Sequence, residues 1–215
     1  MPKRKLRIGI DIDDVLIKSA ELSIQLYNEE YGTKLSLDDW YDFSDPSTYV
    51  KVWASEDVTV LVKRVVHTMV NDAFLDVEPI EGSQEGLRHL NSEGHQLFAI
   101  TGRSESIRRQ TMAMLDKNFD GIFTDNTLFF VDHFEHDGKK ASKAVVGTQL
   151  ELTHFIDDFP DHANAIARVG IKTVLFDAGN YKWSKTGIDA DVASNVIELD
   201  SWQRTVEYLD DEAAQ

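Results

Sequence analysis

Residues 7–16 read Arg-Ile-Gly-Ile-Asp-Ile-Asp-Asp-Val-Leu, and this stretch decides the fold. It begins with a short apolar run rich in β-branched residues, which is typical of a buried strand in a parallel sheet. The run ends in two carboxylates, Asp11 and Asp13, two positions apart. Parallel α/β sheets bind ligands at the carboxyl ends of their strands, so we expect both side chains to reach one crevice there. Two neighbouring carboxylates repel each other, which indicates a bound cation or a proton shared between distinct roles; the alternative is an acidic loop without chemistry.

The bulk composition limits the class of protein. The chain has 215 residues, of which 42% are hydrophobic and 28% charged, enough for one domain with a substantial insertion. A formal net charge of −16 argues against a nucleic-acid polymer or an anionic membrane as the main partner. A small phosphate ester stays compatible, because a divalent cation screens a local acidic site.

The absence of cysteine and of long apolar runs excludes further classes of site and segment. The chain has no cysteine, which excludes disulfides, thiolate nucleophiles and zinc–thiolate sites. No apolar run is long enough for a secretory signal or a membrane span, so we expect a cytoplasmic protein. The sequence does not indicate an oligomeric state.

The periodicity of apolar residues predicts helices first and then strands alternating with helices. Two helical patterns lie between about Lys18 and Pro79, and Gly32 is the expected end of the first. After Pro79 the alternation implies parallel strands joined by right-handed crossovers. The predicted strands cover 95–100, 127–131, 153–156, 171–176 and, at an edge, 194–199, with a possible short strand at 121–124; the predicted helices cover 83–93, 104–117, 142–149, 160–169 and 202–209, with a frayed tail at 209–215.

These elements predict an α/β fold, a doubly wound (Rossmann-like) parallel sheet with a small helical cap inserted after the first strand. The expected core comprises residues 1–17 and 80–215, and the expected cap comprises residues 18–79. The insertion point places this cap at the carboxyl edge of the sheet, beside the polar strand ends.

Four polar motifs follow the predicted strands or precede a helix, in a fixed order. They are Asp11-Ile12-Asp13-Asp14-Val15, Phe98-Ala99-Ile100-Thr101, a lysine ahead of a helix, and Phe155-Ile156-Asp157-Asp158. This order resembles the haloacid dehalogenase (HAD) superfamily of phosphohydrolases, over roughly residues 6–18 and 80–178. An acid at position 13 separates the chain from the dehalogenases of that superfamily, which lack it.

The resemblance implies roles for individual residues. Asp11 is the expected nucleophile, which forms an aspartyl-phosphate and so splits a difficult hydrolysis into two steps. Asp13 is the expected acid and base, and we expect neighbouring acids to raise its pKa so that it is protonated at the first step. Thr101 is expected to hold a phosphate oxygen. The lysine that pairs with the nucleophile and the phosphate is Lys143 or, alternatively, Lys140.

The implied cofactor is Mg²⁺, which suits oxygen-only ligands. By resemblance its ligands are the Asp11 carboxylate, the Asp13 backbone carbonyl and Asp158. Asp157 is the alternative for the last position, or else it orients a water. The sequence alone does not choose between these two acids.

Several other residues have two interpretations. Arg103 contacts substrate or forms a surface salt bridge. His133 and His136 are more consistent with a surface loop than with a metal site, because no third ligand accompanies them. A group of aromatic residues forms the core of the helical insertion or stacks on a substrate ring. This group comprises Trp40, Tyr41, Phe43, Tyr49 and Trp53.

The sequence therefore predicts a magnesium-dependent phosphomonoester hydrolase. It resembles the 5′(3′)-deoxyribonucleotidase branch, which implies a nucleoside 5′-monophosphate as substrate; a sugar phosphate or another small phosphorylated metabolite is the alternative. A signalling receiver domain is disfavoured, because receivers carry their acceptor after the third strand and have no such insertion after the first. An inactive binding module is disfavoured because the expected catalytic side chains are present.

Overall fold

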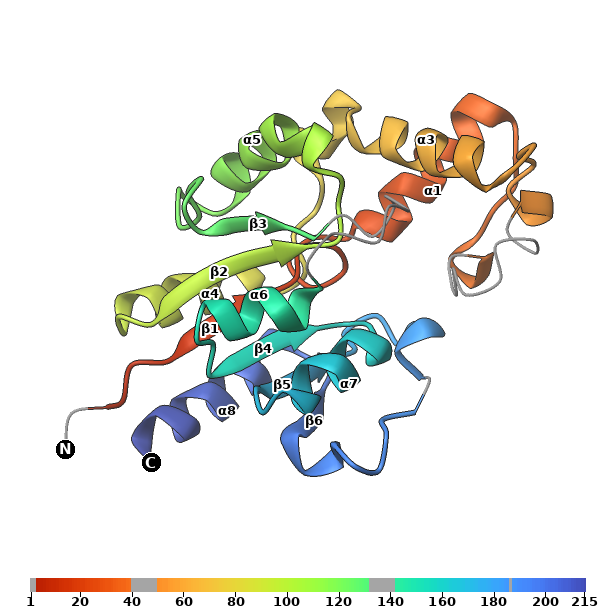
Figure 1. Cartoon of the computed structure of the whole chain (residues 1–215). Coiled ribbons are helices and arrows are strands. Elements are labelled where there is room, and N and C mark those ends of the chain that lie inside the picture. The colour runs from red at the N-terminus through yellow and green to blue at the C-terminus, as the bar shows by residue number, and fades with distance from the viewer. Residues whose placement is uncertain (1–2, 40–49, 132–141, 186) are drawn as a thin grey trace.

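A single six-stranded parallel sheet organises the molecule (Figure 1). The computed structural model describes residues 3–39, 50–131, 142–185 and 187–215. The strand order is β3-β2-β1-β4-β5-β6, and every registered neighbour pair is parallel. This confirms the predicted doubly wound fold. The strands are β1 (Arg7–Ile10), β2 (Gln96–Thr101), β3 (Leu128–Phe130), β4 (His154–Asp157), β5 (Lys172–Phe176) and β6 (Val196–Leu199).

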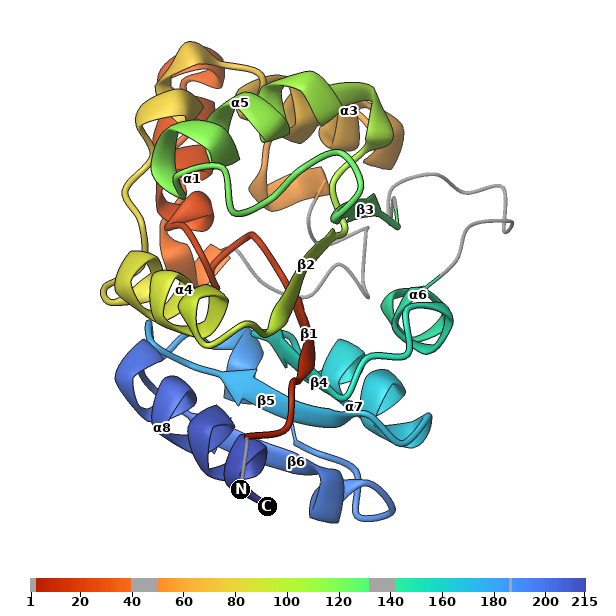
Figure 2. The same cartoon turned by 90° about the vertical axis from the view of Figure 1, so that its left-hand side faces the viewer.

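Helices cover both faces of this sheet (Figure 2). Side chains alternate along a strand, so Leu97 and Ala99 of β2 join one apolar cluster, whereas Phe98 and Ile100 join the other. The first cluster includes residues of α4 (Ser83–Ser92), α5 (Arg108–Asn118) and α8 (Trp202–Ala214). The second includes residues of α6 (Lys143–Gln149) and α7 (Pro160–Arg168).

The segment between β1 and α4 is helical and lies beyond the carboxyl ends of β1 and β2 (Figure 1). It contains α1 (Ser19–Tyr31), η1 (Leu37–Asp39), α3 (Val58–Met69) and η2 (Asp72–Asp76). Trp53 is fully buried with its ring 4.8 Å from that of Tyr27, which confirms the core interpretation for this residue. Trp40, Tyr41, Phe43 and Tyr49 lie outside the described residues.

Two linkers connect this helical segment to the sheet, and they bond to each other. Lys18 N–H donates to the carbonyl of Glu78 at 2.9 Å, and Ile80 N–H donates to the carbonyl of Leu16 at 2.9 Å. The Lys18 ammonium also lies 2.7 Å from a carboxylate oxygen of Glu78. The entry and exit of the insertion are therefore held side by side.

Three local predictions were wrong. Residues 121–124 form no strand, because Asp120 and Gly121 have φ of 52° and 68° and reverse the chain there. The helix predicted from 104 to 117 is divided, with a 3₁₀ turn at η3 (Glu105–Ile107) before α5. The C-terminal tail is helical to Ala214, since Ala213 is buried and its carbonyl accepts a hydrogen bond from Arg4 N–H at 2.8 Å.

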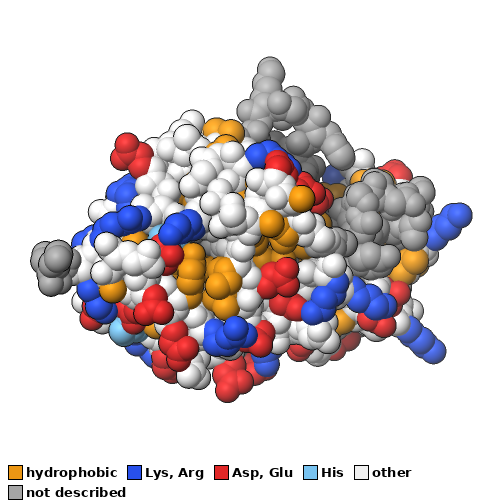
Figure 3. All heavy atoms as spheres, turned by 90° about the horizontal axis from the view of Figure 1, so that it is seen from below, with side chains coloured by type: hydrophobic (Ala, Val, Ile, Leu, Met, Phe, Trp, Pro, Cys, Tyr) orange, Lys and Arg blue, Asp and Glu red, His pale blue; other side chains and the backbone are white. Residues whose placement is uncertain are grey.

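The lower face of the molecule, in the orientation of Figure 1, shows acidic and basic side chains interspersed (Figure 3). Although the net charge of the chain is −16, this face also carries lysine and arginine side chains. In the part of the chain that the structure describes, no helix combines the length and hydropathy needed to cross a bilayer.

Candidate active site

The candidate site lies at the point where the strand order reverses. From β1 the chain passes to β2 and β3 on one side and later returns to β4, β5 and β6 on the other. Asp11 directly follows β1, and its N–H donates to the carbonyl of Ile156 in β4 at 2.9 Å. Such switch points open a crevice at the carboxyl ends of the strands, and the exits of β1, β2 and β4 all open here.

Lys143 joins the exits of β1 and β4. Its ammonium nitrogen lies 2.7 Å from Asp11 Oδ2 and 2.8 Å from Asp157 Oδ2. Lys143 is the first residue of α6, and the Ser142 side chain caps this helix by accepting from Val145 N–H. The helix start thus aims the lysine at the crevice. The alternative, Lys140, lies outside the described residues, as do His133 and His136.

These three charged groups are buried, and each alters the pKa of the others. Burial, together with the nearby Asp157, raises the pKa of Asp11 to about 6 despite the opposing charge of Lys143. Burial also acts against the charged forms of Asp157 and Lys143. For these two groups the attraction of the neighbouring opposite charges outweighs the effect of burial. The pKa of Asp157 is therefore lowered and that of Lys143 is raised. The cluster therefore keeps the lysine charged and Asp157 ionised.

The adjacent acids Asp157 and Asp158 differ in how many of their oxygens are already engaged. Asp157 accepts from Lys143 at Oδ2, and from Phe159 N–H at 3.1 Å and His162 Nδ1 at 3.2 Å at Oδ1. Asp158 accepts from Trp183 Nε1 at Oδ2, at 2.5 Å, and no described residue bonds to its Oδ1. Burial and the charge of Asp157 raise the pKa of Asp158 well above its ordinary value.

The donor set fits a hard divalent cation. One carboxylate oxygen each from Asp11, Asp157 and Asp158 lies within 4.8 Å of the others, and all three residues are buried. Oxygen-only ligands suit Mg²⁺, and a cation there would relieve the repulsion among the carboxylates. Asp157 already accepts three hydrogen bonds, whereas no described residue bonds to Oδ1 of Asp158, so Asp11 and Asp158 are the better-placed donors.

The Asp13 carboxylate makes a two-pronged ion pair with Arg103. Arg103 Nη2 donates to Oδ1 at 2.7 Å and Nε donates to Oδ2 at 2.9 Å. Burial raises the pKa of Asp13, but the charge and hydrogen bonds of Arg103 outweigh it and lower the pKa. The prediction that neighbouring acids raise this pKa was wrong, because it did not include a buried guanidinium. Arg103 itself is buried, so it forms no surface salt bridge.

Asp14 is a buried acid that the sequence reasoning did not consider. Its φ is 56°, and its carboxylate accepts from Ser19 Oγ and Ala20 N–H, both at 3.2 Å. Burial and the charge of Asp13 raise its pKa to about 8. Asp14 thus ties the turn after β1 to the start of α1. The two consecutive acids of the motif, Asp13 and Asp14, were the signal available for this residue.

Thr101 is the last residue of β2 and is fully buried. Its Oγ1 accepts from the backbone N–H of Arg103 at 3.1 Å, which orders the turn after the strand. The hydroxyl proton stays available as a donor to a ligand oxygen.

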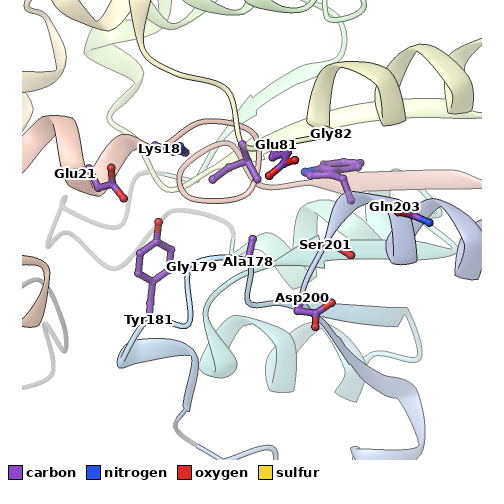
Figure 4. A pocket seen from close by; sticks show the side chains of 12 residues that line it. Lys18, Glu21, Glu81, Gly82, Ala178, Gly179, Tyr181, Asp200, Ser201 and Gln203 are labelled. Carbon is purple, nitrogen blue, oxygen red and sulfur yellow. The ribbon is translucent and has the colours of Figure 1, made fainter.

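A cavity of about 590 Å³ lies against the two linkers (Figure 4). Glu21, Glu81 and Asp200 line it together with Lys18, so its charge disfavours a phosphate ester. Its Tyr181 ring stacks on Trp183 with centroids 4.2 Å apart. The cavity wall therefore supports the tryptophan that bonds to Asp158.

Comparison with known proteins places this geometry in a family. Residues 4–138 match the family model of the 5′ nucleotidase, deoxy (pyrimidine), cytosolic type C protein. The chain belongs to this nucleotidase family. It is also 21% identical to a "putative nucleotidase" of Oceanobacillus iheyensis, over 80% of this chain and 87% of that protein. The predicted HAD resemblance and the phosphatase/nucleotidase class are thereby confirmed.

Solved structures show the same fold as this nucleotidase-family chain. A HAD family hydrolase from Deinococcus radiodurans with bound phosphate and sodium has a TM-score of 0.65 at 16% identity, covering 97% of this chain and 96% of its own. The Bacillus subtilis protein YfnB, bound to magnesium, has a TM-score of 0.65 at 13% identity, covering 96% and 99%.

The structure brings Asp11, Thr101, Lys143 and Asp158 of this nucleotidase-family chain to one edge of the sheet, and Asp13 lies in the turn after β1. Two partners were missed, His162 beside Asp157 and Trp183 beside Asp158. His162 lies five positions after its partner and was detectable on the first turn of α7. Trp183 is separated from Asp158 by 25 positions, and no local pattern indicates the contact.

Proposed function

We propose that the chain is a magnesium-dependent phosphomonoester hydrolase that acts on nucleoside 5′-monophosphates through an aspartyl-phosphate on Asp11. The observation that carries the proposal is the buried lysine between Asp11 and Asp157 at the switch point of the sheet. Membership of the nucleotidase family supports the substrate class. The phosphate and magnesium held by structures of the same fold support the ligand chemistry.

In the first step Asp11 acts as nucleophile. A carboxylate oxygen of Asp11 bonds to phosphorus while the ester P–O bond breaks, and its electron pair leaves with the substrate oxygen. Asp13 passes a proton to this leaving oxygen. Because Arg103 lowers the pKa of Asp13, the carboxylate takes up that proton from solvent before the transfer. Lys143 holds the attacking Asp11 carboxylate in place through its 2.7 Å contact. Its positive charge also stabilises the negative charge that develops on the phosphoryl group in the transition state.

In the second step water attacks the phosphorus of the aspartyl-phosphate. Asp13, now a carboxylate, accepts the proton of this water, and the bond between phosphorus and the Asp11 oxygen breaks. Inorganic phosphate leaves and the Asp11 carboxylate is restored. The Thr101 hydroxyl is placed to donate to a phosphoryl oxygen during both steps.

Asp11, Asp158 and the backbone carbonyl of Asp13 are the proposed ligands of Mg²⁺. When bound, the ion supplies charge neutralisation between the carboxylates and the phosphoryl group. Trp183 donates to Oδ2 of Asp158 and so would orient this carboxylate as a ligand. Asp157 instead fixes the ammonium of Lys143.

Residues 18–79 are proposed to act as a cap over a core of residues 1–17 and 80–215. The helices of this segment lie beyond the carboxyl ends of β1 and β2, where the site opens (Figure 1). A cap at this position excludes water and selects the substrate.

A panel of phosphate monoesters tests the proposal. Purified protein is assayed for phosphate release from nucleoside 5′-monophosphates and sugar phosphates, with magnesium and with a chelator. We expect magnesium-dependent turnover, preference for the nucleotides and loss of activity in Asp11→Asn. A preference for sugar phosphates would overturn the substrate class, and unchanged activity of Asp11→Asn would overturn the mechanism.

A further inference from the structure

Arg103 is a buried cation that the proposed reaction steps leave without a role. Its side chain is 2% exposed, although guanidinium groups are rarely buried without a fixed partner. Its fork binds both oxygens of Asp13, at 2.7 and 2.9 Å. A two-pronged contact of this kind fixes the plane of the carboxylate as well as its distance.

Three different parts of the chain hold Arg103 in place. Its backbone N–H donates to Thr101 Oγ1 at the exit of β2, and its Nη1 lies 3.3 Å from Thr111 Oγ1 in α5. Its guanidinium lies over the Phe74 ring, 5.6 Å from the centroid. Phe74 belongs to η2, on the segment that returns from the helical insertion, and η2 packs against α5.

Asp13 and Arg103 differ in how far their side chains are exposed to solvent, and this indicates which of them can meet a substrate. Asp13 is 24% exposed at its side chain and reaches the crevice, whereas Arg103 is almost completely enclosed. A substrate in the crevice can therefore meet the outer edge of the Asp13 carboxylate but not the guanidinium. Each carboxylate oxygen has more than one lone pair, so a proton can be exchanged on the outer edge while the fork holds the inner edge.

We propose that Arg103 is a positioning residue that orients Asp13 for proton transfer to the leaving oxygen and from the attacking water. The inference rests on the proposed function and adds a residue to it. Arg103 acts through Asp13 and does not contact the substrate. Because the Arg103 guanidinium packs on the ring of Phe74, the orientation of Asp13 depends on how the helical insertion packs against the core.

The chemistry of the leaving group provides a test that a merely structural role would not satisfy. A nucleoside leaving oxygen needs a proton from Asp13, whereas p-nitrophenolate departs without one. The ratio kcat/KM reports the steps up to leaving-group departure, so it isolates the proton-donating half of the reaction. Arg103→Lys keeps the charge but loses the fork.

We expect Arg103→Lys to lower kcat/KM for a nucleoside monophosphate about 100-fold, as misplaced catalytic groups do. For p-nitrophenyl phosphate the loss should be several-fold at most. Arg108→Lys is the matched control, because Arg108 also pairs with a carboxylate, Glu105, and lies over an aromatic ring, Phe130, away from Asp13. This control should leave both substrates unchanged.

A double variant decides whether Arg103 acts through Asp13. In an Asp13→Asn background, Arg103→Lys should cause no further loss with the nucleotide. Equal losses on both substrates with a raised KM, or additive losses in the double variant, would overturn the inference. If Arg103→Lys fails to fold, the same comparison with Phe74→Leu decides, with a smaller loss of the same substrate dependence expected. Absence of magnesium-dependent activity in the parent protein would instead refute the proposed function.

Discussion

Replacing Lys143 with methionine tests the electrostatics of the site most sharply. The substitution keeps the length of the buried chain but removes the cation that lies 2.7 Å from Asp11 and 2.8 Å from Asp157. Two buried carboxylates then face each other without the cation that lay between them.

The expected cost follows from that loss. Removing one partner of a buried ion pair typically destabilises a protein by about 3–5 kcal/mol, and Lys143 serves two partners, so we expect a cost at the upper end, about 5 kcal/mol at pH 7.5. The cost should shrink at lower pH. Without the lysine, the pKa of Asp11 rises further and that of Asp157 is no longer held down by this cation, so protonation of the carboxyl groups removes the uncompensated charges.

The measurement is urea unfolding followed by tryptophan fluorescence, in the presence of a chelator, at pH 7.5 and pH 5.5. Lys185→Met is the matched control, since Lys185 pairs with Asp177 but is 53% exposed at its side chain. Exposed pairs contribute about 1 kcal/mol or less. If Lys143→Met costs no more than this control, or costs more at pH 5.5 than at pH 7.5, the reasoning is refuted.

Three further predictions concern the surroundings of the site. Trp183→Phe removes the indole N–H that donates to Asp158. The magnesium concentration needed for half-maximal thermal stabilisation should then rise about 10- to 100-fold. An unchanged magnesium concentration would count against a role of the Trp183–Asp158 hydrogen bond in holding the ion. Burial lowers the pKa of His154 to about 4 from 6.5, so between these values the unfolded chain binds a proton that the folded chain does not. The free energy of unfolding should then fall as pH decreases through this window, by up to about 1.4 kcal/mol per pH unit. In His154→Phe, the dependence of the free energy of unfolding on pH, measured by denaturation at several pH values, should be flatter. Gly9→Ala places a Cβ 2.5 Å from Phe155 Cδ2 and should cost about 1–3 kcal/mol in urea unfolding; a neutral effect would mean that β1 and β4 pack more loosely than described.

The sheet could be predicted from the sequence because its strands are short buried runs with polar exits. The apolar run before Asp11 and the one before Asp157 each have the pattern of a doubly covered strand, and parallel pairing brings their ends together. The predicted strand at 121–124 failed for a local reason. The left-handed conformations of Asp120 and Gly121 reverse the chain there, and the apolar content of the segment does not reveal them.

The site could be predicted only as far as local order along the chain extends. The positions of Asp11 and Lys143 follow from a strand exit and a helix start, which are local features. The pairing of Arg103 with Asp13 joins residues 90 positions apart, and it reverses the expected direction of the pKa shift of Asp13. Such contacts depend on how the turn after β2 packs on the turn after β1, which single-residue patterns do not encode.

The most direct test of the central claim is to identify the phosphorylated residue. The protein is mixed with magnesium and a ³²P-labelled nucleoside 5′-monophosphate, quenched in acid within milliseconds, digested and analysed by mass spectrometry. The account predicts a hydroxylamine-sensitive acyl-phosphate on Asp11, present in the parent protein and absent from Asp11→Asn. Phosphate on another residue, or full turnover without any labelled protein, would contradict it.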